Sequence, residues 1–251
     1  MAFSASRPLD GTKKAIVIGA SSGIGAAIVT ELAQQGYRVA ALARREDKLN
    51  TLCAGLEQAR AYVHDVTDYD AVPTLFNQIT RDLDGLDLVV YVAGVQPIVA
   101  PDEYNFDKDR QMIEINLLGA MAWLNQAALR FSRAKTGQIV GISSVAGDRG
   151  RSAFPGYHTS KGALNVYLES LRNRLDKQGV TVTTVKPGFV DTPLLENAAK
   201  TFWVIQPSDA AQQIVSAVKK KRQVIYVPGR WRWVMLIIMN IPSFVFRRLS
   251  I

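Results

Sequence analysis

Three polar side chains near the middle of the chain have the types and the spacing that proton transfer requires. Tyr157 and Lys161 stand four residues apart near the start of a predicted helix, and Ser144 lies thirteen residues before the tyrosine. A free phenol has a pKa of about 10, and a nearby ammonium group stabilises the phenolate and lowers that value. We expect Tyr157 to exchange a proton with a substrate oxygen held by the Ser144 hydroxyl, beside a cofactor that performs hydride transfer.

The helix that begins near Pro155 directs two of these side chains inward. Its apolar stripe consists of leucines at steps of three and four, namely Leu164, Leu168, Leu171 and Leu175. Tyr157 and Lys161 continue that stripe at its N-terminal end. Ser144 ends a predicted strand. All three side chains are therefore predicted at the carboxyl edge of a sheet, where open α/β folds bind their ligands.

Short apolar runs rich in β-branched residues alternate with longer segments of helical period. The predicted strands cover residues 14–19, 38–43, 59–64, 86–94, 138–143, 180–188 and 223–228, and the predicted helices cover 23–35, 45–53, 68–81, 105–133, 155–177 and 207–220. Continuous apolar strands separated by helices are typical of a parallel sheet covered on both faces. We predict a doubly wound, Rossmann-like α/β fold with seven parallel strands, forming one catalytic domain over residues 1–228 and a tail over 229–251.

A glycine-rich turn follows the first predicted strand. Gly19, Gly23 and Gly25 have the spacing G-x-x-x-G-x-G, which differs from the commoner G-x-G-x-x-G. At this position the backbone approaches a ligand closely, and the amide groups at the helix N-terminus can hold a phosphate. The turn therefore predicts a dinucleotide site.

The end of the second predicted strand indicates which dinucleotide. Folds that read the ribose 2′-hydroxyl carry an acidic residue there, but this chain has Ala43 followed by Arg44 and Arg45. A guanidinium can grip a 2′-phosphate through two parallel hydrogen bonds. We therefore predict NADP(H) as the cofactor in preference to NAD(H).

Together these motifs resemble those of the short-chain dehydrogenase/reductase family, in its common form, over residues 12 to about 228. The resemblance rests on "GASSGIG", "HDVTD", "YVAG", "INLLG", "YHTSK" and "KPGFVDT". It implies a cofactor site formed by Gly19, Ser21, Ser22, Gly23, Ile24, Gly25, Arg44, Asp65, Val66, Ala93, Gly94, Tyr157, Lys161, Pro187, Gly188, Val190 and Thr192, with Asp65 as the adenine contact and Thr192 at the carboxamide. It implies a catalytic set of Asn116, Ser144, Tyr157 and Lys161, in which Lys161 also holds the nicotinamide ribose and Asn116 keeps a proton-relay water in place.

Three positions depart from the family pattern. Ile18 stands where threonine is usual, and Tyr91 and Val92 stand where two asparagines are frequent. These positions support strand ends, so we expect altered local hydrogen bonding with intact catalysis.

Composition excludes several other classes of function. The net charge is +8, but no acidic residue follows Asp209 and eight basic residues lie from Lys219 onward; removing these eight from the 30 basic residues leaves 22, which equals the number of acidic residues. The body is thus neutral, which argues against nucleic-acid binding. One cysteine and two histidines argue against disulfides and a metal site. Residues 1–14 lack the apolar core of a signal peptide, so a cytoplasmic location is expected.

The basic tail has two competing interpretations. Its apolar part, residues 233–246, is too short to span a bilayer and is interrupted by Asn240, Pro242 and Ser243. In the first, tryptophans beside arginines suit the surface of an anionic membrane, which predicts a membrane-associated protein with a peripheral contact. Alternatively, the tail is a flap over the substrate cleft or a neighbouring subunit.

Two hypotheses on function follow. The first is an NADP(H)-dependent oxidoreductase that interconverts a carbonyl and a secondary alcohol on a small or lipophilic substrate, because the segment at 190–206 that should shape its pocket is apolar. The second is a catalytically silent NADPH-binding redox sensor on the same fold. The apolar helices at 105–133 and 155–177, together with the family resemblance, predict a homodimer or homotetramer.

Overall fold

The core of the molecule is one sheet of seven parallel strands. The computed structural model describes residues 11–195 and 201–249, and the strands lie in the order β3-β2-β1-β4-β5-β6-β7. Their bounds are β1 Lys14–Ile18, β2 Arg38–Ala43, β3 Ala59–Val63, β4 Leu88–Tyr91, β5 Gly137–Ile142, β6 Val180–Pro187 and β7 Val224–Val227. The predicted seven-stranded parallel sheet is confirmed, with strand ends that differ from the predicted ones by two residues or fewer except at β4.

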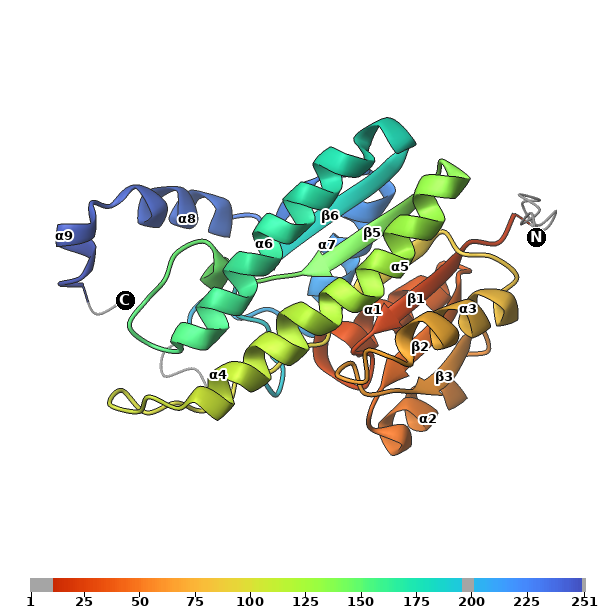
Figure 1. Cartoon of the computed structure of the whole chain (residues 1–251), viewed down its shortest axis with the longest axis horizontal. Helices are drawn as coiled ribbons and strands as arrows, with labels where there is room; N and C mark the ends of the chain where they lie inside the picture. The colour runs from red at the N-terminus through yellow and green to blue at the C-terminus, as the bar shows by residue number, and fades with distance from the viewer. Residues whose placement is uncertain (1–10, 196–200, 250–251) are drawn as a thin grey trace.

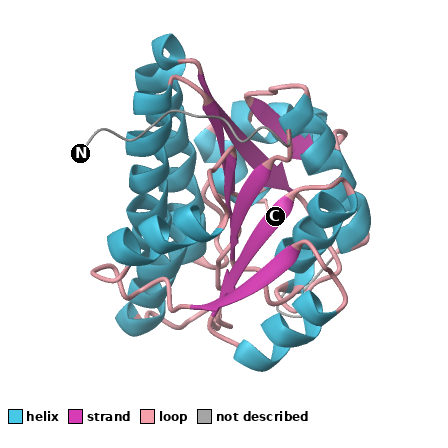
Figure 2. Ribbon diagram, turned by 90° about the vertical axis from the view of Figure 1, so that its right-hand side faces the viewer, coloured by secondary structure: helices cyan, strands magenta, loops and turns pink. Residues whose placement is uncertain are grey.

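Helices cover both faces of the sheet (Figures 1 and 2). One apolar cluster unites the sheet with α1 (Gly23–Gln34), α2 (Glu46–Ala54) and α7 (Pro207–Lys219), and a second unites it with α3 (Val72–Asp82), α5 (Gly119–Ala134) and α6 (Pro155–Leu175). The five residues of β1 are all buried, as a strand covered on both sides requires. The doubly wound, Rossmann-like fold is therefore confirmed.

The predicted helix at 105–133 is one continuous path with an irregular middle. It consists of α4 (Phe106–Ile113), a π-helical turn (Glu114–Leu118) and α5. The Tyr91 hydroxyl at the end of β4 donates a hydrogen bond of 2.6 Å to the carbonyl oxygen of Ile115, inside that turn. Tyr91 is one of the departures from the family pattern. Its side chain anchors the π-helical turn, which is a change in local hydrogen bonding of the kind expected at this position.

The C-terminal tail folds into two further helices, α8 (Trp231–Asn240) and α9 (Ser243–Phe246), which project beyond the sheet at the carboxyl ends of the strands (Figure 1). Within residues 11–195 and 201–249, no helix is long and apolar enough to cross a membrane.

The strand order reverses direction between β1 and β4. Chain connections leave these two neighbouring strands towards opposite halves of the sheet, so their carboxyl ends leave a crevice between the following loops. The glycine-rich turn after β1, the loop after β4 and Ser144 after β5 all open onto this crevice.

Candidate active site

A cavity of about 760 Å³ occupies this crevice. Its volume lies in the range of cofactor and ligand sites. Every residue assigned to the cofactor from the sequence lines it, from Gly19 to Thr192, and so do Ser144, Tyr157 and Lys161. Of the predicted site residues only Asn116 lies behind the cavity wall. The structure therefore brings the two halves of the prediction, the dinucleotide turn and the proton-transfer residues, into one site.

The glycine-rich turn is packed too closely for larger residues. Gly19 has φ +96°, and a Cβ atom there would lie 2.4 Å from the backbone nitrogen of Ala93. A Cβ atom on Gly25 would lie 2.1 Å from the carbonyl oxygen of Gly19. Because both positions exclude side chains, the backbone amides at the start of α1 face the cavity directly, which is the environment that a pyrophosphate requires.

Two arginines flank this turn. Arg45 donates hydrogen bonds of 3.1 and 2.7 Å to Ser21 Oγ and one of 2.7 Å to Ser22 Oγ. Arg44 forms an exposed ion pair of 3.4 Å with Asp65, the residue assigned to the adenine. Both guanidinium groups thus lie beside the turn, and both arginines line the cavity. The sequence pointed to both arginines and assigned Arg44 to the cofactor site; in the structure both line the cavity.

Tyr157 and Lys161 lie on the first turns of α6 and are almost completely buried, with exposed fractions of 7% and 3%. Burial raises the pKa of Tyr157 to about 12, and a hydrogen bond with Ser144 acts in the opposite direction. Burial lowers the pKa of Lys161 to about 8. The expected lowering of the Tyr157 pKa by Lys161 is therefore not found in this structure: the loss of solvent outweighs the hydrogen bond with Ser144, and the pKa lies above 10.

Lys161 lies between Tyr157 and the loop after β4. Its Nζ atom is 5.8 Å from the centre of the Tyr157 ring and donates a hydrogen bond of 2.9 Å to the carbonyl oxygen of Ile142. A Cβ atom on Gly94 would lie 3.3 Å from that Nζ and 3.4 Å from Asn116 Oδ1. The absence of a side chain at Gly94 thus lets the ammonium group and the Asn116 amide approach each other.

Asn116 has all its polar atoms engaged. Its Oδ1 accepts a hydrogen bond of 2.7 Å from the backbone N–H of Val95, and its Nδ2 donates bonds of 3.0 Å to the carbonyl oxygen of Val95 and to Ser160 Oγ. Asn116 sits inside the π-helical turn, a rare element that is frequent at functional sites. In this structure it ties the loop after β4 to α6, and its predicted water-holding role stays a prediction.

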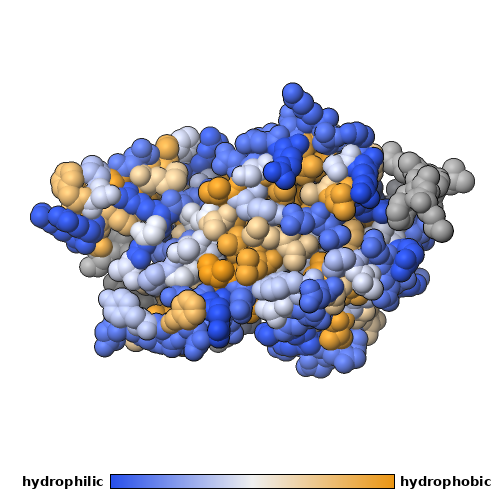
Figure 3. Space-filling view, in the orientation of Figure 1, coloured by the Kyte–Doolittle hydropathy of each residue, from blue (hydrophilic) through white to orange (hydrophobic). Residues whose placement is uncertain are grey.

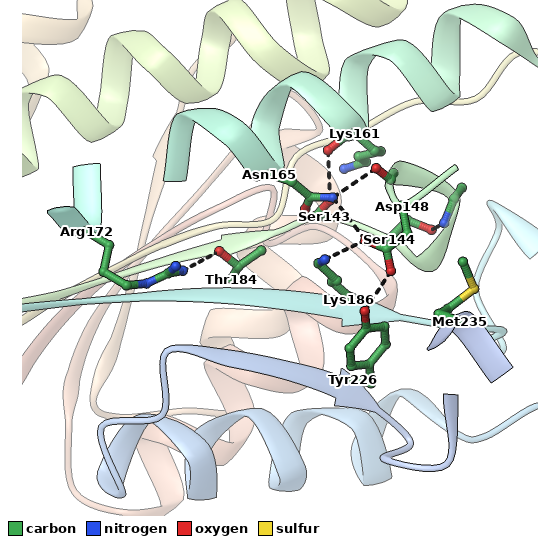
Figure 4. Close-up of polar contacts among 12 residues, drawn as sticks. Ser143, Ser144, Asp148, Lys161, Asn165, Arg172, Thr184, Lys186, Tyr226 and Met235 are labelled. Atoms are coloured by element: carbon green, nitrogen blue, oxygen red, sulfur yellow. Dashed lines mark hydrogen bonds and ion pairs between the residues drawn. The ribbon is translucent and has the colours of Figure 1, made fainter. Parts of the chain in front are cut away.

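A buried ion pair supports the loop that carries Ser144. The carboxylate of Asp148 pairs with Lys186 from β6 and accepts a hydrogen bond of 2.8 Å from the Tyr226 hydroxyl on β7 (Figure 4). Asn165 on α6 donates to the carbonyl oxygen of Gly147 at 3.1 Å. Sequence reasoning missed this network because its members are up to 78 residues apart and each looks like an ordinary polar residue.

Away from the residues assigned to the cofactor, the lining of the cavity is largely apolar. It includes Val145, Ala146, Phe154, Phe189, Leu194 and Leu195, with His158 and Arg151 among them. Burial, followed by the nearby Arg151 charge, lowers the pKa of His158 to about 4, so this ring is neutral at physiological pH. Of the segment 190–206 predicted to shape the pocket, residues 196–200 lie outside the described residues, and Leu194 and Leu195 do line the cavity.

The residues present fit a nicotinamide dinucleotide, given a cavity of suitable size, a glycine turn open to phosphates and two arginines beside it. For a metal the described part of the chain offers no group of three His, Cys, Asp or Glu side chains.

Proteins of similar sequence are described as oxidoreductases. The chain is 37% identical over 186 residues to an uncharacterized oxidoreductase of Myxococcus xanthus, a match that covers 72% of this chain and 74% of the relative. It is 29% identical over 235 residues to an uncharacterized oxidoreductase of Mycobacterium tuberculosis, covering 90% and 91%.

Solved structures share the fold. A variant of actinorhodin polyketide ketoreductase with NADPH has a TM-score of 0.80 and 25% identity, over 87% of this chain and 96% of that chain. ElxO with NADP bound has a TM-score of 0.77 at 22% identity, over 86% of this chain and 96% of that chain.

The family model described as short chain dehydrogenase matches residues 13–202. With that model covering most of its length and the Ser144, Tyr157 and Lys161 side chains gathered at one cofactor cleft, the chain belongs to the short-chain dehydrogenase family of oxidoreductases.

Proposed function

We propose that the protein is an NADP(H)-dependent oxidoreductase that interconverts a carbonyl group and a secondary alcohol. The observation that carries this proposal is the convergence of Ser144, Tyr157 and Lys161 on the cavity that the glycine-rich turn also lines. A site that only senses a bound nucleotide needs the turn and the arginines, but it has no use for a buried phenol, hydroxyl and ammonium group next to one another.

In the direction of reduction, Tyr157 donates a proton. With a pKa of about 12 it is fully protonated at physiological pH and serves as a general acid for the substrate oxygen, which the Ser144 hydroxyl orients. When bound, a reduced nicotinamide would supply the hydride to the carbonyl carbon, breaking its own C–H bond and becoming oxidised. The C=O π bond breaks, a C–H and an O–H bond form, and the resulting phenolate regains its proton from solvent.

Lys161 stabilises the phenolate while it exists. Its pKa of about 8 leaves the ammonium group charged at neutral pH, within 5.8 Å of the ring centre. A positive charge in a water-excluded site attracts the phenolate more strongly than it would in solution. The charge therefore favours the transition state, in which the phenol is losing its proton, over the neutral ground state.

The preference for NADP(H) is supported by Arg44 and Arg45 and by the absence of an acidic side chain at the end of β2. Two NADP(H) complexes among the similar folds are consistent with it. The apolar lining at Phe154, Phe189 and Leu195 supports a lipophilic carbonyl substrate.

The proposal is tested by following NADPH absorbance with a panel of ketones, aldehydes, steroids and acyl substrates. Consumption of NADPH with at least one of them is expected. If nucleotide binds but no carbonyl in the panel is reduced and no alcohol is oxidised, the redox-sensor alternative takes its place.

Cofactor choice is tested by Arg44→Asp. This change should lower the ratio of kcat/KM values for NADPH over NADH by about tenfold or more, because a guanidinium–phosphate contact becomes a like-charge repulsion. Lys48→Asp makes the same charge change on an exposed part of α2 that does not line the cavity, and should leave the ratio near the wild-type value. An equal effect of both substitutions would contradict a specific role for Arg44.

A further inference from the structure

The C-terminal arm, residues 229–249, has one face attached to the body. Trp231 and Met235 of α8 are buried, and a Cβ atom on Gly188 would collide with the Trp231 ring. Arg149, in the loop between Ser144 and Tyr157, donates a hydrogen bond to the carbonyl oxygen of Ile238, and its guanidinium lies 3.8 Å from the centre of the Phe246 ring. The arm is therefore held against the loops of the active-site cleft.

The other face of the arm is apolar and uncovered. Trp233 and Ile237 on α8 are 65% and 67% exposed, and Phe244 on α9 is 62% exposed. Leu236 and Met239 are exposed between them. Such large apolar side chains at helical spacing, rimmed by charged residues, mark an interaction surface. Figure 3 shows apolar and strongly hydrophilic side chains together at the end of the molecule formed by α8 and α9.

Other apolar side chains are exposed at the same carboxyl edge of the sheet. Tyr104, just before α4, is 97% exposed, and Ile98 and Phe106 of the same segment are also exposed. That segment and the arm lie at the same end of the molecule (Figure 1). Phe202 and Trp203 add two exposed aromatic rings, and Arg230 stacks on Trp203 at 4.6 Å.

The positive charge of this surface indicates an anionic partner. Arg230, Arg232, Arg247 and Arg248 are exposed, and no acidic residue occurs after Asp209. Tryptophan side chains suit the boundary between water and hydrocarbon, and each exposed arginine near the surface gains from anionic lipid headgroups. A helix of ten residues followed by one of four, each too short to cross a bilayer, suits a position in the plane of the interface.

We propose that the C-terminal arm docks the protein onto an anionic phospholipid membrane, with the outer face of α8 and α9 inserted among the headgroups. Because the inner face of the arm contacts the loop between Ser144 and Tyr157, docking turns the mouth of the cleft towards the bilayer. The proposed docking depends on the arm and not on the reaction, so it is independent of the proposed function.

Co-sedimentation of the full chain with phospholipid vesicles tests it. Binding is expected to vesicles of equimolar phosphatidylcholine and phosphatidylglycerol, to weaken as salt is raised, and to be absent with phosphatidylcholine alone. Trp233→Gln/Ile237→Gln should abolish it, and Arg247→Glu/Arg248→Glu should raise the apparent Kd by about tenfold or more.

Lys219→Glu/Lys220→Glu is the matched control. It makes the same charge change at the end of α7, which lies at the amino edge of the sheet because the strand β7 begins just after it, and it should bind nearly as wild type does. Circular dichroism melts establish that each variant is folded. Failure of the wild type to sediment, equal loss in both charge variants, or retained binding by Trp233→Gln/Ile237→Gln would each overturn the proposal. The proposal would also be overturned if light scattering showed a dimer for wild type and a monomer for Trp233→Gln/Ile237→Gln, while neither wild type nor this variant bound vesicles. A second copy of the chain would then cover the surface.

Discussion

Lys161 places an ammonium group in the interior of the protein, where 3% of the residue is exposed. Burial holds its pKa at about 8, below the ordinary value of 10.5. Between these two values the unfolded chain retains a proton that the folded protein has released, so raising the pH through this window stabilises the folded state. Below pH 8 the full cost of the buried charge is present. The buried charge that the proposed mechanism requires therefore opposes stability at neutral pH.

Lys161→Met should consequently stabilise the nucleotide-free protein while removing its activity. The pKa shift corresponds to a cost on the order of 3 kcal/mol, offset in part by about 1 kcal/mol for the lost hydrogen bond to Ile142. Chemical denaturation at pH 7 should show a free energy of unfolding that is higher than in wild type, and the difference should shrink from pH 8 to about 10.5. A variant that is less stable than wild type at pH 7, or a difference independent of pH, would argue against a charged buried lysine.

Asp148 acts at the scale of elements, because its carboxylate joins the loop after β5 to β6, β7 and α6. Removing one member of a buried ion pair leaves the other charge uncompensated, which costs about 3 kcal/mol or more. Asp148→Asn should therefore lower the free energy of unfolding by that order. Lys186→Met in the same background should recover part of the loss, since the orphaned charge is then gone.

Asp102→Asn, at an exposed position, serves as the control and should change stability by less than about 0.5 kcal/mol. If Asp148→Asn lowered the free energy of unfolding no more than this control does, the network would make no contribution to stability.

The elements were largely predictable because their signals are local. Strands such as Lys14–Ile18 are short, continuous apolar runs, and α6 carries its leucines at helical spacing. The π-helical turn at Glu114–Leu118 was not predicted, because one extra residue in a helical turn leaves the apolar pattern nearly unchanged. The residues that form the site could be identified from motifs. The pKa of Tyr157 could not be predicted, because it depends on burial by residues distant in sequence.

At the scale of the whole molecule, the outer surface of α5 and α6 carries an apolar patch. Figure 3 shows it in the middle of the view, over the two helices that face the viewer in Figure 1. Val166 and Leu129 are exposed there. An apolar patch on two neighbouring helices is suited to a two-fold contact with a second copy of the chain.

Size-exclusion chromatography with light scattering should give the mass of a dimer or tetramer for wild type. Val166→Glu should shift the mass towards that of the monomer, because it buries a charge at the centre of the contact. Val63→Glu, on the edge strand β3, makes the same change elsewhere and should leave the mass unaltered. A wild-type monomer at micromolar concentration would contradict the predicted assembly.

The central claim is that the Tyr157 hydroxyl transfers a proton to or from a substrate oxygen at a nicotinamide cofactor, and Tyr157→Phe tests it most directly. This variant should lower kcat/KM for carbonyl reduction by about 10²- to 10⁴-fold, while its Kd for NADPH, measured by fluorescence titration, stays close to the wild-type value. Reduction at the wild-type rate by a variant that binds NADPH normally would contradict the account.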